Sequence, residues 1–312
     1  MSLLVVGTVA FDDIETPFGR AEKIVGGAAT YIAWAASYFT DVIRMVSIIG
    51  DDFPQSELDA LQKRNIDTAG IKIVEGGKSF FWAGRYQHNL NARDTLITDL
   101  NVLADFDPVL PPHYRDSEYV MLGNLTPAIQ LSVINQMARR PKVIALDTMN
   151  YWMDNSMDEL LDVLAHIDLL IINEEEARQL AGEYSLLKAN DIIRKMGPKY
   201  LVIKKGEHGA LLFGEDKVFF SPALLLTEVQ DPTGAGDTFA GGLMGYLAGN
   251  EELDFEVLKQ AIICGSAMAS FCVEKFGTEA LRNIPSQQLM ERLEKFSMMM
   301  QFQVPGLRKS FA

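Results

Sequence analysis

Residues 231–243 read Asp-Pro-Thr-Gly-Ala-Gly-Asp-Thr-Phe-Ala-Gly-Gly-Leu. From 235 to 248 the apolar residues recur at helical spacing, and Gly249-Asn250 predicts where that helix ends. The Gly-Ala-Gly step therefore lies at a helix N-terminus, where first-turn N–H groups lack intrahelical partners and the helix dipole favours an anion. This stretch predicts an anion site beside a carboxylate, Asp237. That carboxylate either complements the dipole or acts as a general base toward a hydroxyl.

On the N-terminal side of this stretch, short apolar runs alternate with helical patterns. The predicted strands are Leu3–Val9, Val42–Ile49, Tyr119–Leu122, Lys142–Asp147, Asp168–Asn173 and Tyr200–Lys204. The predicted helices cover 28–39, 55–64, 127–139, 156–165, 174–181 and 186–196. Strands that are apolar throughout are buried on both faces, so the pattern predicts an α/β fold of three layers around a parallel sheet. Ligands of such sheets bind beyond the carboxyl ends of the strands.

Two stretches interrupt the alternation. Residues 12–24 lack a helical period, and residues 71–98 form two extended segments, Ile71–Val74 and Ser79–Gln87, joined by a glycine turn. We expect a small β-sheet lid from about 12–25 and 71–98, with plain surface hairpins as the alternative. No repeat or linker divides the chain, so residues 1–312 are expected to form a single domain with this lid.

Composition and charge exclude several classes of protein. The chain has 312 residues and a formal net charge of −14, which argues against a broad surface for nucleic acid or an anionic membrane. No apolar run approaches the roughly 18 residues that span a bilayer. Two cysteines are too few for a disulfide framework or a structural zinc site and fit a reducing cytoplasm. The glycine fingerprint of a dinucleotide-binding fold is missing after the first strand, which weakens an oxidoreductase as an alternative.

The run at 231–239 resembles the C-terminal signature of the ribokinase-like (PfkB) carbohydrate kinases. Further matches occur in the order of that family and span nearly the whole chain. They are Gly7 with Asp12, Gly26-Gly27-Ala28-Ala29, Gly50-Asp51-Asp52, Asn173 to Glu176, Lys204 to Gly209, and Phe276-Gly277-Thr278. The resemblance implies an ATP-dependent phosphotransferase that acts on a hydroxyl of a sugar or sugar-like substrate.

The resemblance also implies roles for individual residues. Asp237 would be the general base, and the amides of Gly234, Ala235, Gly236 and Asp237 would form the anion hole for the transferred phosphoryl group. Asn173 and Glu176 match an element that helps place Mg²⁺ and phosphate, with Glu176 acting through water, because Mg²⁺ keeps several of its waters. Without the resemblance, the same pair reads as a strand-end asparagine followed by an acidic first helical turn.

The remaining implied contacts belong to the nucleotide and the acceptor. Lys204 and Gly206 would line the ATP site, and Gly277 would close the adenine pocket. Asp231 and Thr233 match positions where relatives can bind a monovalent cation such as K⁺. Candidate acceptor-binding residues are Asp12, Gly26, Gly27, Tyr31 and Asn150.

One position departs from the family pattern and bears on the acceptor. Tyr31 stands where many sugar and nucleoside kinases have asparagine, and a hydroxyl cannot offer the paired donor and acceptor of an amide. Tyr31 is therefore either an acceptor ligand or a core residue. The alternatives to a sugar kinase are a nucleoside kinase, in which lid aromatics such as Trp82 and Tyr86 would stack on the base, and a non-catalytic ligand-binding relative. An exposed lid edge would suit a homodimer.

Overall fold

The main body is built on one sheet of nine strands. The computed structural model describes residues 1–90, 92–251 and 253–301. Across the sheet the strands are β13 (Lys217–Ser221), β12 (Ala210–Gly214), β11 (Tyr200–Lys204), β10 (Leu169–Asn173), β9 (Val143–Leu146), β8 (Tyr119–Leu122), β1 (Ser2–Val6), β4 (Val42–Gly50) and β5 (Ile66–Val74). All neighbours pair in parallel except β11–β12 and β12–β13.

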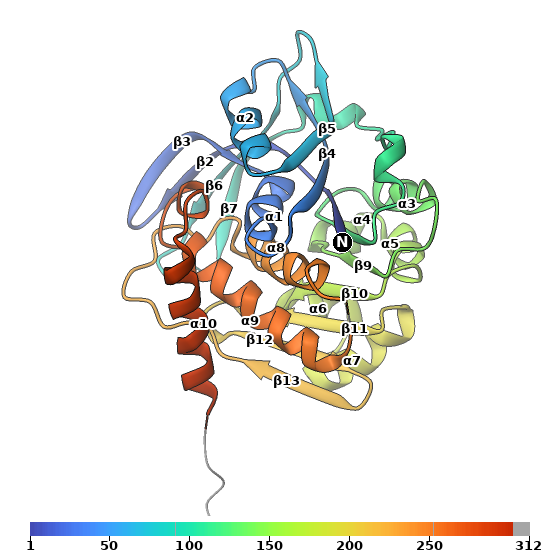
Figure 1. Ribbon diagram of the computed structural model, residues 1–312, viewed down its shortest axis with the longest axis vertical. Coiled ribbons are helices and arrows are strands. Elements are labelled where there is room, and N and C mark those ends of the chain that lie inside the picture. The colour runs from blue at the N-terminus through green and yellow to red at the C-terminus, as the bar shows by residue number, and fades with distance from the viewer. Residues whose placement is uncertain (91, 252, 302–312) are drawn as a thin grey trace, which may run out of the picture.

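Helices cover both faces of this sheet, which confirms the three-layer α/β prediction (Figure 1). One face is packed by α1 (Ala28–Ala36), α2 (Gln55–Lys63), α8 (Ala235–Ala248), α9 (Phe255–Cys272) and α10 (Ser286–Met300). The other is packed by α3 (Pro127–Asn135), α4 (Asn150–Asn155), α5 (Met157–Leu164), α6 (Glu174–Ala181) and α7 (Leu186–Ile193). Successive side chains of a strand point to opposite faces, so Leu3 joins one core and Leu4 the other. This two-sided burial explains why the central strands are apolar throughout.

Short 3₁₀ helices complete several of the connections. They are η1 (Asn101–Asp105), η2 (Pro112–Tyr114), η3 (Arg194–Met196), η4 (Gly206–His208) and η5 (Glu279–Leu281). Helix α9 is long and apolar enough by composition to span a bilayer, but 56% of it is buried inside the protein. Its apolar residues are therefore explained by core packing.

A second sheet of four strands forms the lid and projects from one side of the molecule (Figure 1). Its order is β3 (Gly19–Gly26), β2 (Ala10–Thr16), β6 (Phe80–Tyr86) and β7 (Arg93–Asp99). Strand β2 runs antiparallel to β3 and parallel to β6. On the edge strand β7, Leu96 is 52% and Ile97 is 46% exposed. These are side chains that a second subunit would cover, and the lid-mediated homodimer stays a prediction.

The lid is smaller than the sequence indicated. Ile71–Val74 was expected in the lid, but these residues are the second half of β5 and pair with β4 as far as Gly50 and Val74. The expectation was wrong because residues 67–70 (Asp-Thr-Ala-Gly) are polar or small and interrupt the apolar pattern in the first half of that strand. The turn after Val74 therefore carries the chain from the main sheet into the lid.

Glycines bring α8 close to its neighbours and so fix where that helix begins. A Cβ on Gly241 would lie 2.3 Å from the Ile32 carbonyl oxygen, and one on Gly245 would lie 2.6 Å from the Ala36 Cα. Both contacts are to the backbone of α1, so α8 and α1 approach each other without side chains between them. The N-terminus of α8 is held in place by this packing.

Candidate active site

Residues 234–236 lie at the N-terminus of α8, as the sequence indicated, and anion binding there stays a prediction. Gly234 is the residue before the helix and has a left-handed backbone with φ 73°. The Ala235 amide donates to the Pro232 carbonyl at 3.2 Å, whereas the amides of Gly234 and Gly236 have no backbone acceptor among the described residues. The Asp237 amide likewise has no backbone acceptor among the described residues, so these three N–H groups are the ones that an anion could use at this helix end, whereas the predicted Ala235 amide is already paired.

Three neighbouring strands bring polar side chains to the same edge of the sheet. Asp147 follows β9, Asn173 ends β10 and Lys204 ends β11, and the register pairs Asn173 with Lys204. The Lys204 Nζ lies 3.3 Å from each carboxylate oxygen of Asp147, and both side chains are largely buried. A Cβ built on Gly236 would lie 3.1 Å from the same Nζ. A buried ammonium group thus lies between the strand ends and the first turn of α8.

Asn173 and Glu176 form a reciprocal cap at the start of α6. The Asn173 side chain accepts from the Glu176 amide at 2.8 Å, and the Glu176 carboxylate accepts from the Asn173 amide at 2.7 Å. This is the capping box that the acidic first turn allows. The second reading of the pair, a strand-end asparagine before a helix, therefore describes its local structure. A further role toward metal and phosphate stays a prediction.

The cleft at this edge holds more negative than positive side chains. Burial, with a further contribution from the Asp147 charge, raises the pKa of Asp237 to about 7, against the opposing charges of Lys204 and Arg93. Burial likewise raises the pKa of Glu176 to about 7, although the nearby Lys204 opposes it. Burial alone would lower the pKa of Lys204, but Asp147, Glu176 and Asp237 together raise it. Asp237 is thus a carboxyl group whose protonation changes near neutral pH, as a general base requires.

The acceptor candidates Asp12, Gly26 and Gly27 lie together where the lid meets the main sheet. Asp12 is on β2, opposite Ile24 of β3 and Trp82 of β6, and is 4% exposed. Burial, followed by the charges of Asp231 and Asp237, raises the pKa of Asp12 to about 8. A Cβ on Gly26 would lie only 1.9 Å from the Asp12 Oδ2, so glycine is needed beside this carboxylate.

Tyr31 is a core residue in this structure. Its side chain is 1% exposed and its hydroxyl has no hydrogen-bond partner among the described residues. A Cβ on Gly234 would lie 2.4 Å from the Tyr31 ring, so the ring packs directly against the loop that precedes α8. Of the two readings of this residue, the geometry favours core packing over contact with an acceptor.

Asn150 begins α4, close in sequence to Asp147. Its side-chain amide donates to Gln179 of α6 at 2.5 Å. The amide is thus paired with a neighbouring helix, and its contact with an acceptor stays a prediction.

Asp231 links the loop before α8 to the chain after α9. Its carboxylate is fully buried, and its two oxygens accept from the amides of Thr233 at 2.8 Å and Gly277 at 3.3 Å. Gly277 has φ 59°, and a Cβ there would lie 3.1 Å from Ile24 on lid strand β3. These contacts fix the loop geometry. A monovalent cation at Asp231 and Thr233, and an adenine contact at Gly277, stay predictions.

The segment after β11 lies beside α6. Gly206 opens η4 with φ 56°, in the left-handed region, and the preceding Lys205 pairs with Glu174 of α6 at 2.6 Å. The lysine doublet is therefore divided, with Lys204 in the cleft and Lys205 bound to α6. This arrangement leaves Lys204 as the lysine of the doublet that faces the anion site.

Three cleft residues were not identified from the sequence as site residues. Asp147 ends the predicted strand Lys142–Asp147, at the sheet edge where ligands bind, but it was given no role in the site. Tyr86 was noted only as a lid aromatic, but its hydroxyl accepts from the Thr233 hydroxyl at 3.1 Å. Arg93 was missed entirely, because nothing in the local sequence distinguishes a single arginine on a lid strand. Its charge nevertheless acts on both Asp237 and Glu176.

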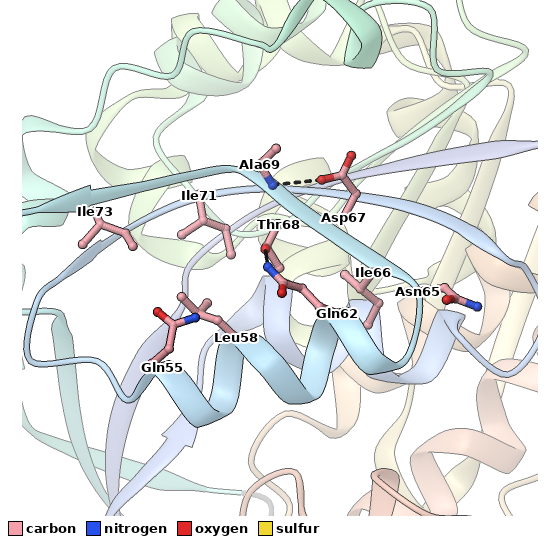
Figure 2. A pocket seen from close by; sticks show the side chains of 10 residues that line it. All are labelled: Gln55, Leu58, Gln62, Asn65, Ile66, Asp67, Thr68, Ala69, Ile71 and Ile73. Atoms are coloured by element: carbon pink, nitrogen blue, oxygen red, sulfur yellow. Dashed lines mark hydrogen bonds between the residues drawn. The ribbon is translucent and has the colours of Figure 1, made fainter.

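A separate pocket of about 610 Å³ lies between α2 and the edge strand β5 (Figure 2). Gln62 and Thr68 are hydrogen-bonded to each other across it at 2.8 Å, and Asp67 caps the Ala69 amide at 2.9 Å. These two bonds join residues that line the pocket, and none of its lining residues belongs to the site described above.

Comparison with known proteins identifies the family. A model of the pfkB family carbohydrate kinases matches residues 4–285. A cytidine kinase of Thermococcus kodakarensis is 29% identical over 281 residues, covering 89% of this chain and 98% of the relative. A nucleoside kinase of Methanocaldococcus jannaschii is 25% identical over 88% of this chain and 87% of the relative.

Solved structures show the same fold. The M. jannaschii nucleoside kinase structure has a TM-score of 0.75 at 21% identity and covers 95% of this chain and 99% of its own. A Burkholderia thailandensis nucleoside kinase in complex with inosine has a TM-score of 0.75 at 19% identity, covering 94% and 96% of the two chains. Arabidopsis thaliana ribokinase with ribose and ATP has a TM-score of 0.73 at 20% identity, covering 94% and 98%.

The three-layer fold with its small second sheet is that of solved sugar and nucleoside kinases, and the family match shows that the chain is a phosphotransferase of this kind. This chain belongs to the pfkB family of carbohydrate kinases. It is a carbohydrate or nucleoside kinase, and its family implies ATP as the phosphoryl donor.

Proposed function

We propose that this enzyme, in the cytoplasm, transfers the γ-phosphoryl group of ATP to a hydroxyl of a nucleoside or a sugar, with Asp237 as the general base. One observation carries this proposal. Asp237 lies in the first turn of α8, directly after the amides of Gly234 and Gly236, and its pKa of about 7 suits a base at neutral pH.

The chain supplies each function that phosphoryl transfer needs from a protein, namely positioning and charge stabilisation. The free amides and the dipole of α8 would stabilise the transferred group, and the Lys204 ammonium, 3.3 Å from Asp147, would add positive charge. Asp237 would accept the proton of the acceptor hydroxyl. The lid would exclude water, to which the phosphoryl group could otherwise be lost.

Among the described residues, no three carboxylate, histidine or cysteine side chains converge closely enough to hold a metal ion by themselves, so Mg²⁺ would have few protein ligands and would keep several of its waters. Glu176 and the nearby Asp147 are buried and Asp237 is half-buried, and the pKa of each carboxyl group is raised, so a divalent cation beside them would relieve the cost of their charges. Glu176 would hold the ion through water. When bound, Mg²⁺ supplies neutralisation of phosphate charge.

A nucleoside is the acceptor that the observations favour over a plain sugar. Cytidine kinase and nucleoside kinases are among the relatives similar to this chain over most of its length. The lid also brings Trp82 into register with Asp12, so an aromatic surface and a hydroxyl-binding carboxylate lie on neighbouring strands. Asp12 would bind hydroxyls of the ribose, and Trp82 would stack on the base.

The test is ADP release from Mg·ATP across a panel of nucleosides, pentoses, hexoses and sugar phosphates. We expect release with nucleosides, and we expect Asp237→Asn to lower kcat at least about 100-fold, the low end for a general base. Asp162→Asn, on an exposed position of α5, is the matched control and should behave as wild type. Near-normal turnover by Asp237→Asn would remove the mechanism. ATP binding without release for any acceptor would instead support a ligand-binding relative.

A further inference from the structure

The loop that precedes α8 packs on one aromatic ring. Gly234, the last residue of this loop, has a left-handed backbone with φ 73°. A Cβ built on Gly234 would lie 2.4 Å from two atoms of the Tyr31 ring and 2.5 Å from a third, and these are the three atoms nearest to it. The ring therefore fills the space beside Gly234 that the side chain of any other residue would need.

Tyr31 is itself fixed by the packing of α1 on α8. These two helices meet backbone to backbone at Gly241 and Gly245. The Tyr31 side chain is 1% exposed and belongs to the core on that face of the sheet. Side chains in such a core are close-packed, so the ring is a rigid surface next to Gly234.

The ring of Tyr31, rather than its hydroxyl, makes this contact. The hydroxyl has no hydrogen-bond partner among the described residues. Burial raises the pKa of Tyr31 well above its usual value, so the hydroxyl stays neutral. A buried hydroxyl without a partner contributes no bond that could hold the loop. A phenylalanine ring at this position would therefore offer Gly234 the same surface.

The proposed reaction depends on the orientation of the Gly234 amide. This N–H group has no backbone acceptor among the described residues and is one of those left for an anion. The Gly234 carbonyl is fixed, because it accepts from the Thr238 amide at 2.8 Å. The peptide unit that carries the N–H group is held less firmly, by a weak bond from the Cys272 thiol to the Thr233 carbonyl at 3.5 Å. Because glycine has wide backbone freedom, rotation about its φ would turn this N–H group unless the ring beside it prevents that.

We propose that Tyr31 is a positioning residue, whose ring holds the Gly234 amide in the orientation that stabilises the transferred phosphoryl group. This inference rests on the proposed function. Tyr31 acts through Gly234 and does not contact the acceptor. Hydrogen-bond donors stabilise a transition state most when they are fixed before the reaction. Loosening the loop should therefore slow the chemical step more than it weakens acceptor binding.

The experiment compares the kinetics of acceptor-dependent ADP release, using the acceptor that the wild type turns over fastest. We expect Tyr31→Leu to lower kcat by between about 10-fold and about 100-fold, the upper value being the low end for loss of an oxyanion-hole donor. The KM for the acceptor should change less than about threefold, because the loop acts on the transition state. Tyr31→Phe keeps the ring and should keep kcat within about twofold of wild type.

Tyr119→Leu is the matched control for loss of core packing. Tyr119 is a fully buried tyrosine in the same core. It begins β8, so it lies at the edge of the sheet opposite the site. This variant should lose about as much resistance to urea as Tyr31→Leu and should keep wild-type kcat. Equal losses of kcat in the two leucine variants would reduce the effect to general destabilisation and overturn the inference.

Gly234→Ala perturbs the same contact from the side of the loop, and it decides the question if Tyr31→Leu does not fold. Its methyl group would push the loop away from the ring, so kcat should fall at least about 10-fold at a nearly unchanged KM for the acceptor. Wild-type kcat in Tyr31→Leu or in Gly234→Ala would refute the positioning role, and so would a change confined to KM. A loss in Tyr31→Phe as large as in Tyr31→Leu would assign the role to the hydroxyl instead. Failure of the wild type to release ADP with every acceptor would overturn the proposed function, which separates the two failures.

Discussion

Replacing Gly26 by alanine tests whether Asp12 binds the acceptor, because it moves that carboxylate without removing it. The new Cβ would lie 1.9 Å from the Asp12 Oδ2 and 2.7 Å from its Cγ. An ordinary contact needs about 3.4 Å, so the carboxylate must retreat by roughly 1.5 Å. A 1 Å misplacement in an active site can cost about 100-fold in rate. We therefore expect kcat/KM for the acceptor to fall about 100-fold, while the free energy of unfolding falls by about 1–3 kcal/mol, as for overpacking at a buried site.

The assay is acceptor-dependent ADP release, with urea unfolding to measure stability. Gly19→Ala is the matched control, because Gly19 lies at the other end of β3 and a Cβ there would meet only the Phe276 ring at 3.3 Å. That variant should keep kcat/KM within about twofold, as is usual for a surface change away from such features. Affinity for Mg·ADP should be unchanged in both variants, because Asp12 is assigned to the acceptor.

A double-mutant cycle with Asp12→Ala shows whether the effect passes through the carboxylate. If it does, Gly26→Ala costs nothing further once Asp12 is alanine. Two results would refute the reasoning. One is wild-type kcat/KM in Gly26→Ala, and the other is a full, additive loss in the double variant, which would place the effect in the backbone of β3.

Three further predictions concern protonation and backbone geometry. Asp237 must be ionised to accept a proton, and its pKa is about 7. The logarithm of kcat/KM should therefore rise with pH at a slope near 1 below pH 7 and level off above it. A flat profile from pH 5.5 to 8 would count against Asp237 as the base. The pKa of Asp12 is about 8 in the folded state against about 3.9 unfolded, so the native state binds more protons in that window. Unfolding free energy of the unliganded enzyme should therefore fall as pH rises from about 4 to 8, and Asp12→Asn should fall less steeply. Gly234 has φ 73°, and a Cβ there would lie 2.4 Å from the Tyr31 ring, so Gly234→Ala should lower the free energy of unfolding through both backbone strain and a steric clash. The control is Gly182→Ala, where φ is 61° and no atom lies within 4 Å of the new Cβ, and it should lose only the roughly 1 kcal/mol of backbone strain. Equal losses in the two variants would show that the Tyr31 ring moves aside easily.

The central strands could be predicted from the sequence because burial on both faces leaves a clear mark. Tyr119–Leu122 and Tyr200–Lys204 have the predicted bounds, since each is a short apolar run between polar residues. The antiparallel strands β12 and β13, of which β13 is the edge of the sheet, were missed. On β13 the side chains of Val218 and Phe220 are 54% and 51% exposed. Apolar residues on this strand therefore do not mark a buried face, as they do on a central strand.

Some features of the site depend on residues that are neighbours in the sequence, and others depend on contacts between distant segments. The helix start at 234–236 and the Asn173–Glu176 capping pair were predictable, because helix starts depend on residues next to one another. The Lys204–Asp147 pair joins residues 57 apart in the chain and exists only because β9 and β11 flank β10. The contact of Tyr86 with Thr233 spans 147 residues and depends on where the lid comes to rest.

The carboxylates at the site have opposite effects on the two parts of the proposed reaction. They raise the pKa of the base, but their negative charges would repel phosphate. An Asp237 carboxyl in water would have a pKa near 3.9 and would be a weak base at pH 7. Burial and the Asp147 charge bring it to about 7, where it accepts a proton far more readily. The cost is a cluster of carboxylates that would repel phosphate, and Lys204 alone cannot neutralise Asp147, Glu176 and Asp237 together. In the proposed function, the remaining positive charge would arrive with the nucleotide as Mg²⁺, so that the base is strong before binding and phosphate is accommodated once the nucleotide and metal are in place.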